Sequence, residues 1–121
     1  MIAAVLTRPG QYDSPVSKAP REIEYALFAR ITRALQDAAH ANEADAGIQA
    51  VVDNNRLWTE LAADLSHSDN ALPAELKRNL LGLALFSIRH GARILGDGGD
   101  VSTLIDINLN IMKGLRAGGR E

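Results

Sequence analysis

Cysteine is absent from this 121-residue chain, which excludes disulfides, thiolate metal ligands and a cysteine nucleophile. Aromatic residues make up only 4%, and the β-branched clusters bounded by turn residues that mark an all-β chain are missing. No apolar run approaches the roughly 18 residues that span a bilayer, and the apolar stretch 2–6 has neither the length nor the preceding basic residues of a signal peptide. We therefore expect a cytoplasmic protein without membrane insertion.

The chain also has only a small excess of negative charge. The formal net charge is −2 and the pI is about 5.9. Because nucleic-acid-binding domains are usually strongly basic, these values argue against direct nucleic-acid binding.

The residues that are present favour one helical domain. Hydrophobic residues make up 46% of the chain, enough to fill a single core. Residues 1–17 contain two prolines and a glycine and show no sustained period, so we expect a loosely ordered N-terminal arm there. We expect a bundle domain over 18–117 and a C-terminal tail over 118–121.

Apolar residues recur with helical spacing in three segments, 20–41, 48–65 and 73–95, separated by a break at 42–47 and a polar turn at 66–70. Glycines at 96, 98 and 99 are expected to end the third helix. The predicted apolar arcs are Ile23, Leu27, Ile31, Ala34, Leu35 and Ala38; Ile48, Val51, Val52, Trp58, Leu61, Ala62 and Leu65; and Leu76, Leu80, Leu81, Ala84, Leu85, Ile88 and Leu95.

The last segment is ambiguous, because residues 105–111 alternate between apolar and polar as a half-buried strand would. Over the longer window 101–115 the apolar residues form one wide helical arc, and Asp100 can cap its start. A lone strand would also have no partner in this chain. The sequence therefore predicts a small all-α four-helix bundle. The fourth arc comprises Val101, Leu104, Ile105, Ile107, Leu109, Ile111, Met112 and Leu115.

Some side chains do not fit their predicted surroundings. Asn54, Asn55 and Asn108 fall on apolar arcs, and because buried amides must be hydrogen-bonded they predict a buried polar cluster that sets the register of the helices. The alternative is that they line a groove for a partner's backbone. Conversely, Phe86 falls on the outer arc of its helix, and Tyr25 is a weaker case of the same kind.

The helical wheel surrounds Phe86 with basic residues, Arg78, Arg89 and Arg93. Aromatic residues and arginine are enriched at binding hot spots, so Phe86, the three arginines and Tyr25 are candidate partner-binding residues. The alternative for Phe86 is a single exposed aromatic that another part of the chain covers.

Residue patterns typical of catalytic, metal-binding or phosphate-binding sites are few. His40, His67 and His90 lie on different predicted elements, and none has a His, Asp or Glu at the spacing of a helical metal site. The run 97–100 lacks the alternation and closing glutamate of a calcium loop. There is no Gly-rich phosphate loop and no Gly-x-Ser-x-Gly turn. We expect no catalytic residues, no metal and no cofactor, and hence a binding protein rather than an enzyme.

Several short strings in a fixed order resemble the FlaF flagellar biosynthesis regulators of alphaproteobacteria. They lie at 20–28, 32–35, 54–58, 72–76, 87–90, 104–108 and 111–115, so the resemblance covers nearly the whole predicted bundle. Residues 1–17 do not clearly match.

The resemblance implies a cytoplasmic factor that acts after transcription to promote the synthesis or export of flagellin, with flagellin as its protein partner and FlbT as a second regulator. A small helical bundle can bind an amphipathic helix in an apolar groove, which suits a chaperone-like role. The alternative is a regulator that contacts flagellin messenger RNA through Arg78, Arg89 and Arg93, alone or with FlbT.

Overall fold

The computed structural model describes residues 18–41 and 44–118, with side chains described at 25–41 and 45–114. Four helices make up this part of the chain, α2 (Lys18–Ala41), α3 (Ala44–Leu65), α4 (Ala74–Asp97) and α5 (Ser102–Gly118), and no strand is found in it. The all-α four-helix prediction is therefore confirmed, including the helical choice for the last segment. The expected N-terminal arm, 1–17, lies outside the described residues.

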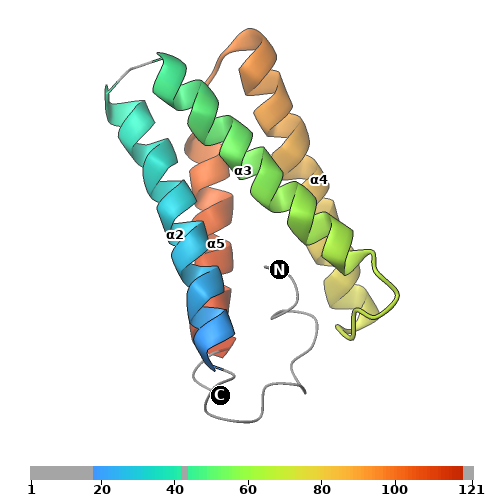
Figure 1. The fold of residues 1–121 in the computed structure, drawn as a ribbon. Coiled ribbons are helices and arrows are strands. Elements are labelled where there is room, and N and C mark those ends of the chain that lie inside the picture. Colours follow the sequence, from blue (N-terminus) through green and yellow to red (C-terminus); the bar gives the residue numbers. More distant parts are fainter. Residues whose placement is uncertain (1–17, 42–43, 119–121) are drawn as a thin grey trace.

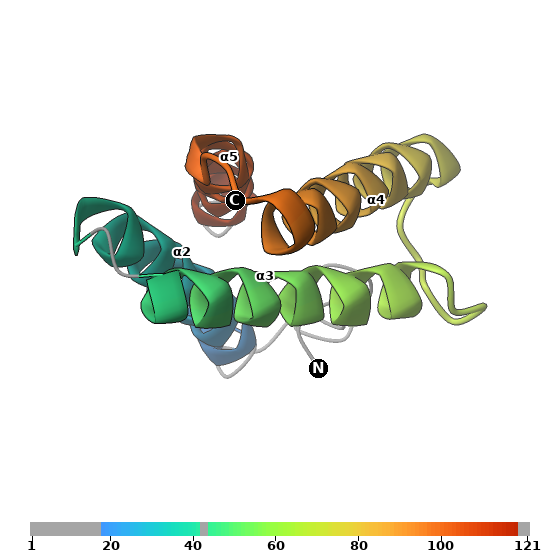
Figure 2. The ribbon, with the colours of Figure 1, turned by 90° about the horizontal axis from the view of Figure 1, so that it is seen from above.

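The helices run up and down, and each packs against its neighbours in the order α2, α3, α4, α5 and back to α2 (Figure 1). Seen from above, α2 and α3 form one layer and α5 and α4 form the other, with α5 on the side of α2 and α4 on the side of α3 (Figure 2). The α3–α4 interface is the most extensive, whereas α4 and α5 touch over a short stretch. The α2–α5 pair and the α3–α4 pair diverge toward the end of the bundle that carries the α3–α4 connection (Figure 1).

The core forms around an aromatic pair. Trp58 and Phe28 are completely buried and meet edge to face with ring centroids 5.8 Å apart, a favoured geometry for aromatic rings. Leu61, Leu65 and Ile107 pack in the same cluster. A second cluster, formed by Leu35, Ala50, Val51 and Leu104, lies nearer the α2–α3 connection. The predicted burial of Trp58 is confirmed.

Local sequence signals define both ends of α4 and the start of α5. Pro73 precedes α4, and Gly98, with φ of 81°, ends it by donating its N–H to the Ile94 carbonyl over 2.7 Å. Asp100 then accepts the backbone N–H of Ser102 over 2.9 Å, which confirms its predicted capping role.

Two sequence expectations about the helices are wrong. The predicted break at 42–47 is shorter, because α3 begins at Ala44 and contains Gly47. One glycine costs a helix only about 1 kcal/mol relative to alanine, and the neighbouring alanines together with Asp45 in the first turn offset it. Several residues placed on buried arcs are also exposed, namely Ala34, Ile48, Leu76, Leu85, Leu95 and Leu109.

Candidate protein-binding surface

The face of α4 that points away from the bundle carries most of the predicted binding residues. Small buried residues, Ala84, Ser87 and Gly91, mark the side that faces the core. Arg78, Arg89 and Arg93 are exposed on the opposite side, together with Phe86. We call the surface formed by these four side chains and that of Leu85 the outer face of α4.

Phe86 is 51% exposed, and its ring stacks on that of His90, one helical turn away, with centroids 5.8 Å apart and planes 16° apart. The stack restricts the rotamers of Phe86, so less side-chain entropy remains to be lost if a partner covers it.

Leu85 is a member of this face that the sequence did not reveal. The helical wheel placed it on the buried arc, but its side chain is 51% exposed. The reason is that α4 approaches α3 through small residues, so its buried arc is centred on Ala84, Ser87 and Gly91 rather than on its leucines. The outer face therefore has two large apolar side chains next to each other in sequence.

The arginines of this face have no acidic partner among the described residues. None of Arg78, Arg89 and Arg93 forms an ion pair or a side-chain hydrogen bond with another described residue. The acidic residues of α4, Glu75 and Asp97, lie near the two ends of the helix. The middle of the face is therefore basic, although the chain as a whole is slightly acidic.

Tyr25 is not brought together with this surface. It lies on α2, is partly buried and packs against the aromatic core cluster, rather than standing on an outer face as the sequence suggested. Contacts between α2 and α4 are minor, since the extensive neighbours of α2 are α3 and α5.

The three asparagines lie inside the bundle. Asn108 of α5 accepts the indole N–H of Trp58 over 2.9 Å and donates its amide to Asn54 Oδ1 over 2.7 Å, and all three side chains are fully buried. Asn55 donates to the Ile88 carbonyl of α4 over 3.4 Å. The arrangement links α3 to both α5 and α4.

This polar cluster is not completely satisfied by the described residues. Asn54 Nδ2, Asn55 Oδ1, Thr32 Oγ1 and Ser87 Oγ are buried without a hydrogen-bond partner in that part of the chain. All of these side chains face the interior of the bundle, so they are poorly placed to meet a protein partner.

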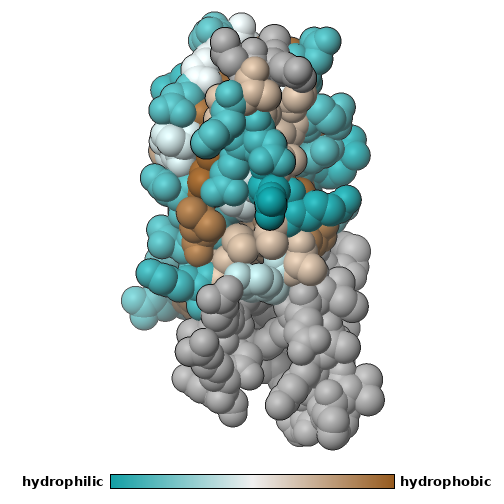
Figure 3. All heavy atoms as spheres, turned by 90° about the vertical axis from the view of Figure 1, so that its left-hand side faces the viewer, coloured by the Kyte–Doolittle hydropathy of each residue, from teal (hydrophilic) through white to brown (hydrophobic). Residues whose placement is uncertain are grey.

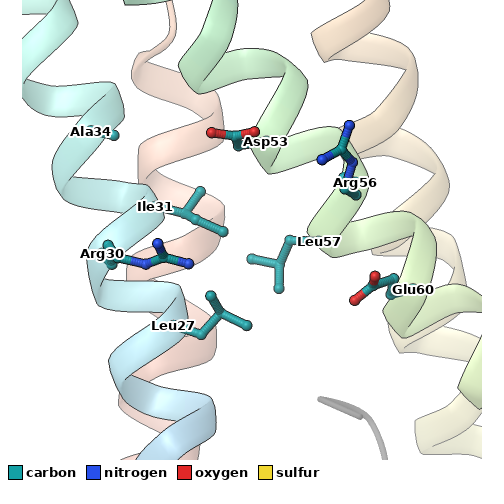
Figure 4. Close-up of a pocket in the computed structure, with 8 residues that line it drawn as sticks. All are labelled: Leu27, Arg30, Ile31, Ala34, Asp53, Arg56, Leu57 and Glu60. Carbon is teal, nitrogen blue, oxygen red and sulfur yellow. The ribbon is translucent and has the colours of Figure 1, made fainter.

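A shallow groove of about 340 Å³ separates α2 from α3 (Figure 4). Leu27, Ile31 and Leu57 form its apolar floor, and the charged Arg30 and Glu60 project into it from opposite walls (Figure 4). Ile31 and Leu57 are already buried, so the groove offers little uncovered apolar surface. Hydrophilic side chains also cover most of the described part of the face over α2 and α5 (Figure 3). Neither region matches the exposed apolar character of the outer face of α4.

Other site types find little support in the described residues. No group of three His, Asp or Glu side chains there is placed to hold a metal ion. Of the helices that the structure describes, none has both the length and the apolar character needed to cross a bilayer.

Fold and surface together define a small helical bundle that exposes an apolar and basic helix face. The family model for the flagellar protein FlaF matches residues 11–115, so the chain belongs to the FlaF family and is a flagellar protein. The match includes residues 11–17, for which we expected no clear match. Comparison with curated proteins and with solved structures gave no match.

Proposed function

We propose that this protein binds flagellin in the cytoplasm as a chaperone-like factor that promotes flagellin synthesis or export, and that the outer face of α4 makes the contact. Membership of the FlaF family supports the flagellar setting. The observation that carries the choice of surface is the exposure of Phe86 and Leu85 beside three arginines that form no ion pair with another described residue.

The chemistry of this face suits an amphipathic helix with acidic or amide groups along its edges. Such a helix would bury Phe86 and Leu85 under its apolar side, and burial of a large apolar side chain is worth about 1.5–3 kcal/mol. Its polar edges would meet Arg78, Arg89 and Arg93. A flagellin helix held in this way would be shielded from aggregation before export.

The proposed role requires binding alone. The protein acts without a catalytic residue, metal or cofactor, and the buried polar cluster of Asn54, Asn55 and Asn108 serves the bundle rather than the partner. FlbT, the second regulator that the family implies, would act alongside it.

A second candidate function uses the same arginines on a different partner. Arg78, Arg89 and Arg93 could contact the phosphates of flagellin messenger RNA while Phe86 stacks on a base, as in single-strand binders. The net charge of −2 and the single aromatic on that face favour the protein partner.

Two assays on the purified chain separate these functions. The first is size-exclusion chromatography of the protein mixed with flagellin, in which we expect one co-eluting complex. The second is a gel shift with the flagellin leader transcript, in which we expect no shift at physiological salt. A shifted transcript with no flagellin complex would replace the proposed function by the alternative.

A further inference from the structure

A second pocket lies at the end of the bundle that carries the α4–α5 connection. It encloses about 450 Å³ between the end of α2, the start of α3, the end of α4 and the residues that lead into α5. Its walls are mostly apolar, and Ile48 and Leu95 line it while remaining 52% and 38% exposed. These are two of the residues whose apolar spacing predicted burial, yet no described part of the chain covers them.

The dimensions suit a side chain rather than a cofactor. Small-molecule sites typically occupy about 300–1,000 Å³ and enclose most of the ligand. The volume of this pocket is near the lower limit of that range. The pocket is open to solvent, and few polar groups line it. An inserted leucine or phenylalanine would bury itself and cover Ile48 and Leu95.

The rim of the pocket is negative. Asp100 is the one charged residue among the described residues that line it, and none of these is Lys or Arg. Asp97, also exposed, stands next to the lining glycine Gly98 at the end of α4. The last turn of α4 contains no basic residue, so the negative end of its dipole adds to the two carboxylates.

Hydrogen bonds keep Asp100 ionised. The backbone N–H and the hydroxyl of Ser102 both donate to its carboxylate and hold its pKa below the usual value. The carboxylate is exposed and is already held by Ser102, so it can meet a cation without rearrangement.

We propose that this pocket is a second docking site, which takes one bulky apolar side chain of a protein partner that is flanked by Lys or Arg. Its charge is opposite to that of the outer face of α4. One acidic helix therefore cannot satisfy both surfaces, and the protein can engage two segments of different charge.

A pair of short synthetic peptides tests the pocket on the full chain, independently of flagellin. One carries a central leucine between arginines, and the other carries the same leucine between glutamates. Gly98 and Gly99 line the pocket, so their backbone amide resonances report binding in ¹H–¹⁵N spectra. We expect both resonances to shift with the arginine peptide, which should bind about tenfold more tightly than the glutamate peptide because each exposed ion pair adds up to about fivefold.

Two substitutions at exposed positions should keep the fold and change the pocket. Ala39 is exposed and lines the pocket, so Ala39→Trp should fill it and weaken the arginine peptide about tenfold or more. Ala26→Trp, at an exposed position of α2 outside the pocket, is its control. Asp97→Lys should raise the melting temperature, because a cation suits a helix C-terminus, and yet weaken the peptide about threefold.

Asp106→Lys makes the same charge change on an exposed position of α5 outside the pocket and should leave peptide binding unchanged. Equal binding of the two peptides, or no shift of Gly98 and Gly99 with either, would overturn the proposal. So would shifts of these amides that depend on protein concentration without peptide, since a second copy of the chain would then be the occupant.

Discussion

Replacement of Asn108 by alanine should strongly destabilise the bundle, although it removes only a few atoms. The Asn108 side chain accepts the indole N–H of Trp58 and donates to Asn54 Oδ1, all without access to solvent. Its removal leaves one buried donor and one buried acceptor without partners. Each such group costs about 1–3 kcal/mol, so we expect a loss of about 2–6 kcal/mol from a typical domain stability of about 5–15 kcal/mol.

Urea unfolding followed by Trp58 fluorescence measures this loss. The matched control is Asn110→Ala, an exposed asparagine on the same helix, which should change the free energy of unfolding by no more than about 0.5 kcal/mol. A double variant, Asn54→Ala with Asn108→Ala, adds a second test. Because the two single variants both break the Asn54–Asn108 bond, the double variant should lose about 1–3 kcal/mol less than their sum.

Two results would show that the hydrogen bonds of Asn108 do not stabilise the bundle as proposed. One is an Asn108→Ala variant as stable as Asn110→Ala, which would mean that the indole N–H and the Asn54 amide find other partners. The other is strict additivity of the Asn54 and Asn108 losses, which would mean that the bond between them contributes nothing.

Substitutions of two glycines in α4 and of Asp100 should also change the stability of the fold. Gly91→Ala should destabilise the fold by about 1–3 kcal/mol, because a Cβ at this position would collide with Asn55 Oδ1. Gly82→Ala should stabilise the fold by about 0.5–1 kcal/mol, because a Cβ at that position meets open space. Thermal unfolding of the two variants compares them. Asp100→Ala should lower the melting temperature at neutral pH. Because Ser102 lowers the pKa of Asp100 from its ordinary 3.8, this contribution is complete above that value and is lost as the pH falls through the lowered pKa, so the two melting curves should converge in acid.

The sequence predicted the number and type of helices because four long segments keep one apolar period. It predicted the burial of individual residues less well. Phe28 was off the expected arc but is fully buried, since α2 packs against both α3 and α5 and therefore needs a wider apolar side. The single-helix wheel cannot represent two neighbours. Ile48 and Leu95 were expected inside but lie at the end of the bundle, where none of the described helices covers them.

The candidate site was only partly predictable for the same reason. Phe86 and the three arginines followed from the wheel, because they lie opposite the apolar arc of α4 under any reasonable choice of its centre. Leu85 did not, because its exposure depends on the close approach of α3 to the small residues of α4. The pocket at the bundle end requires four chain segments to meet, and no local pattern encodes that meeting.

If flagellin binds the outer face of α4, as proposed, Phe86→Ala should have a lower affinity for flagellin. Isothermal titration calorimetry should show binding weakened about thirtyfold, as expected for truncation of an aromatic anchor worth about 2 kcal/mol. The free energy of unfolding should change by no more than about 0.5 kcal/mol, because half of the side chain is already in solvent. Leu109→Ala, which truncates a similarly exposed apolar side chain on α5, should bind as the unaltered protein does. Equal affinity of the Phe86→Ala and Leu109→Ala variants for flagellin would mean that flagellin does not bind the outer face of α4.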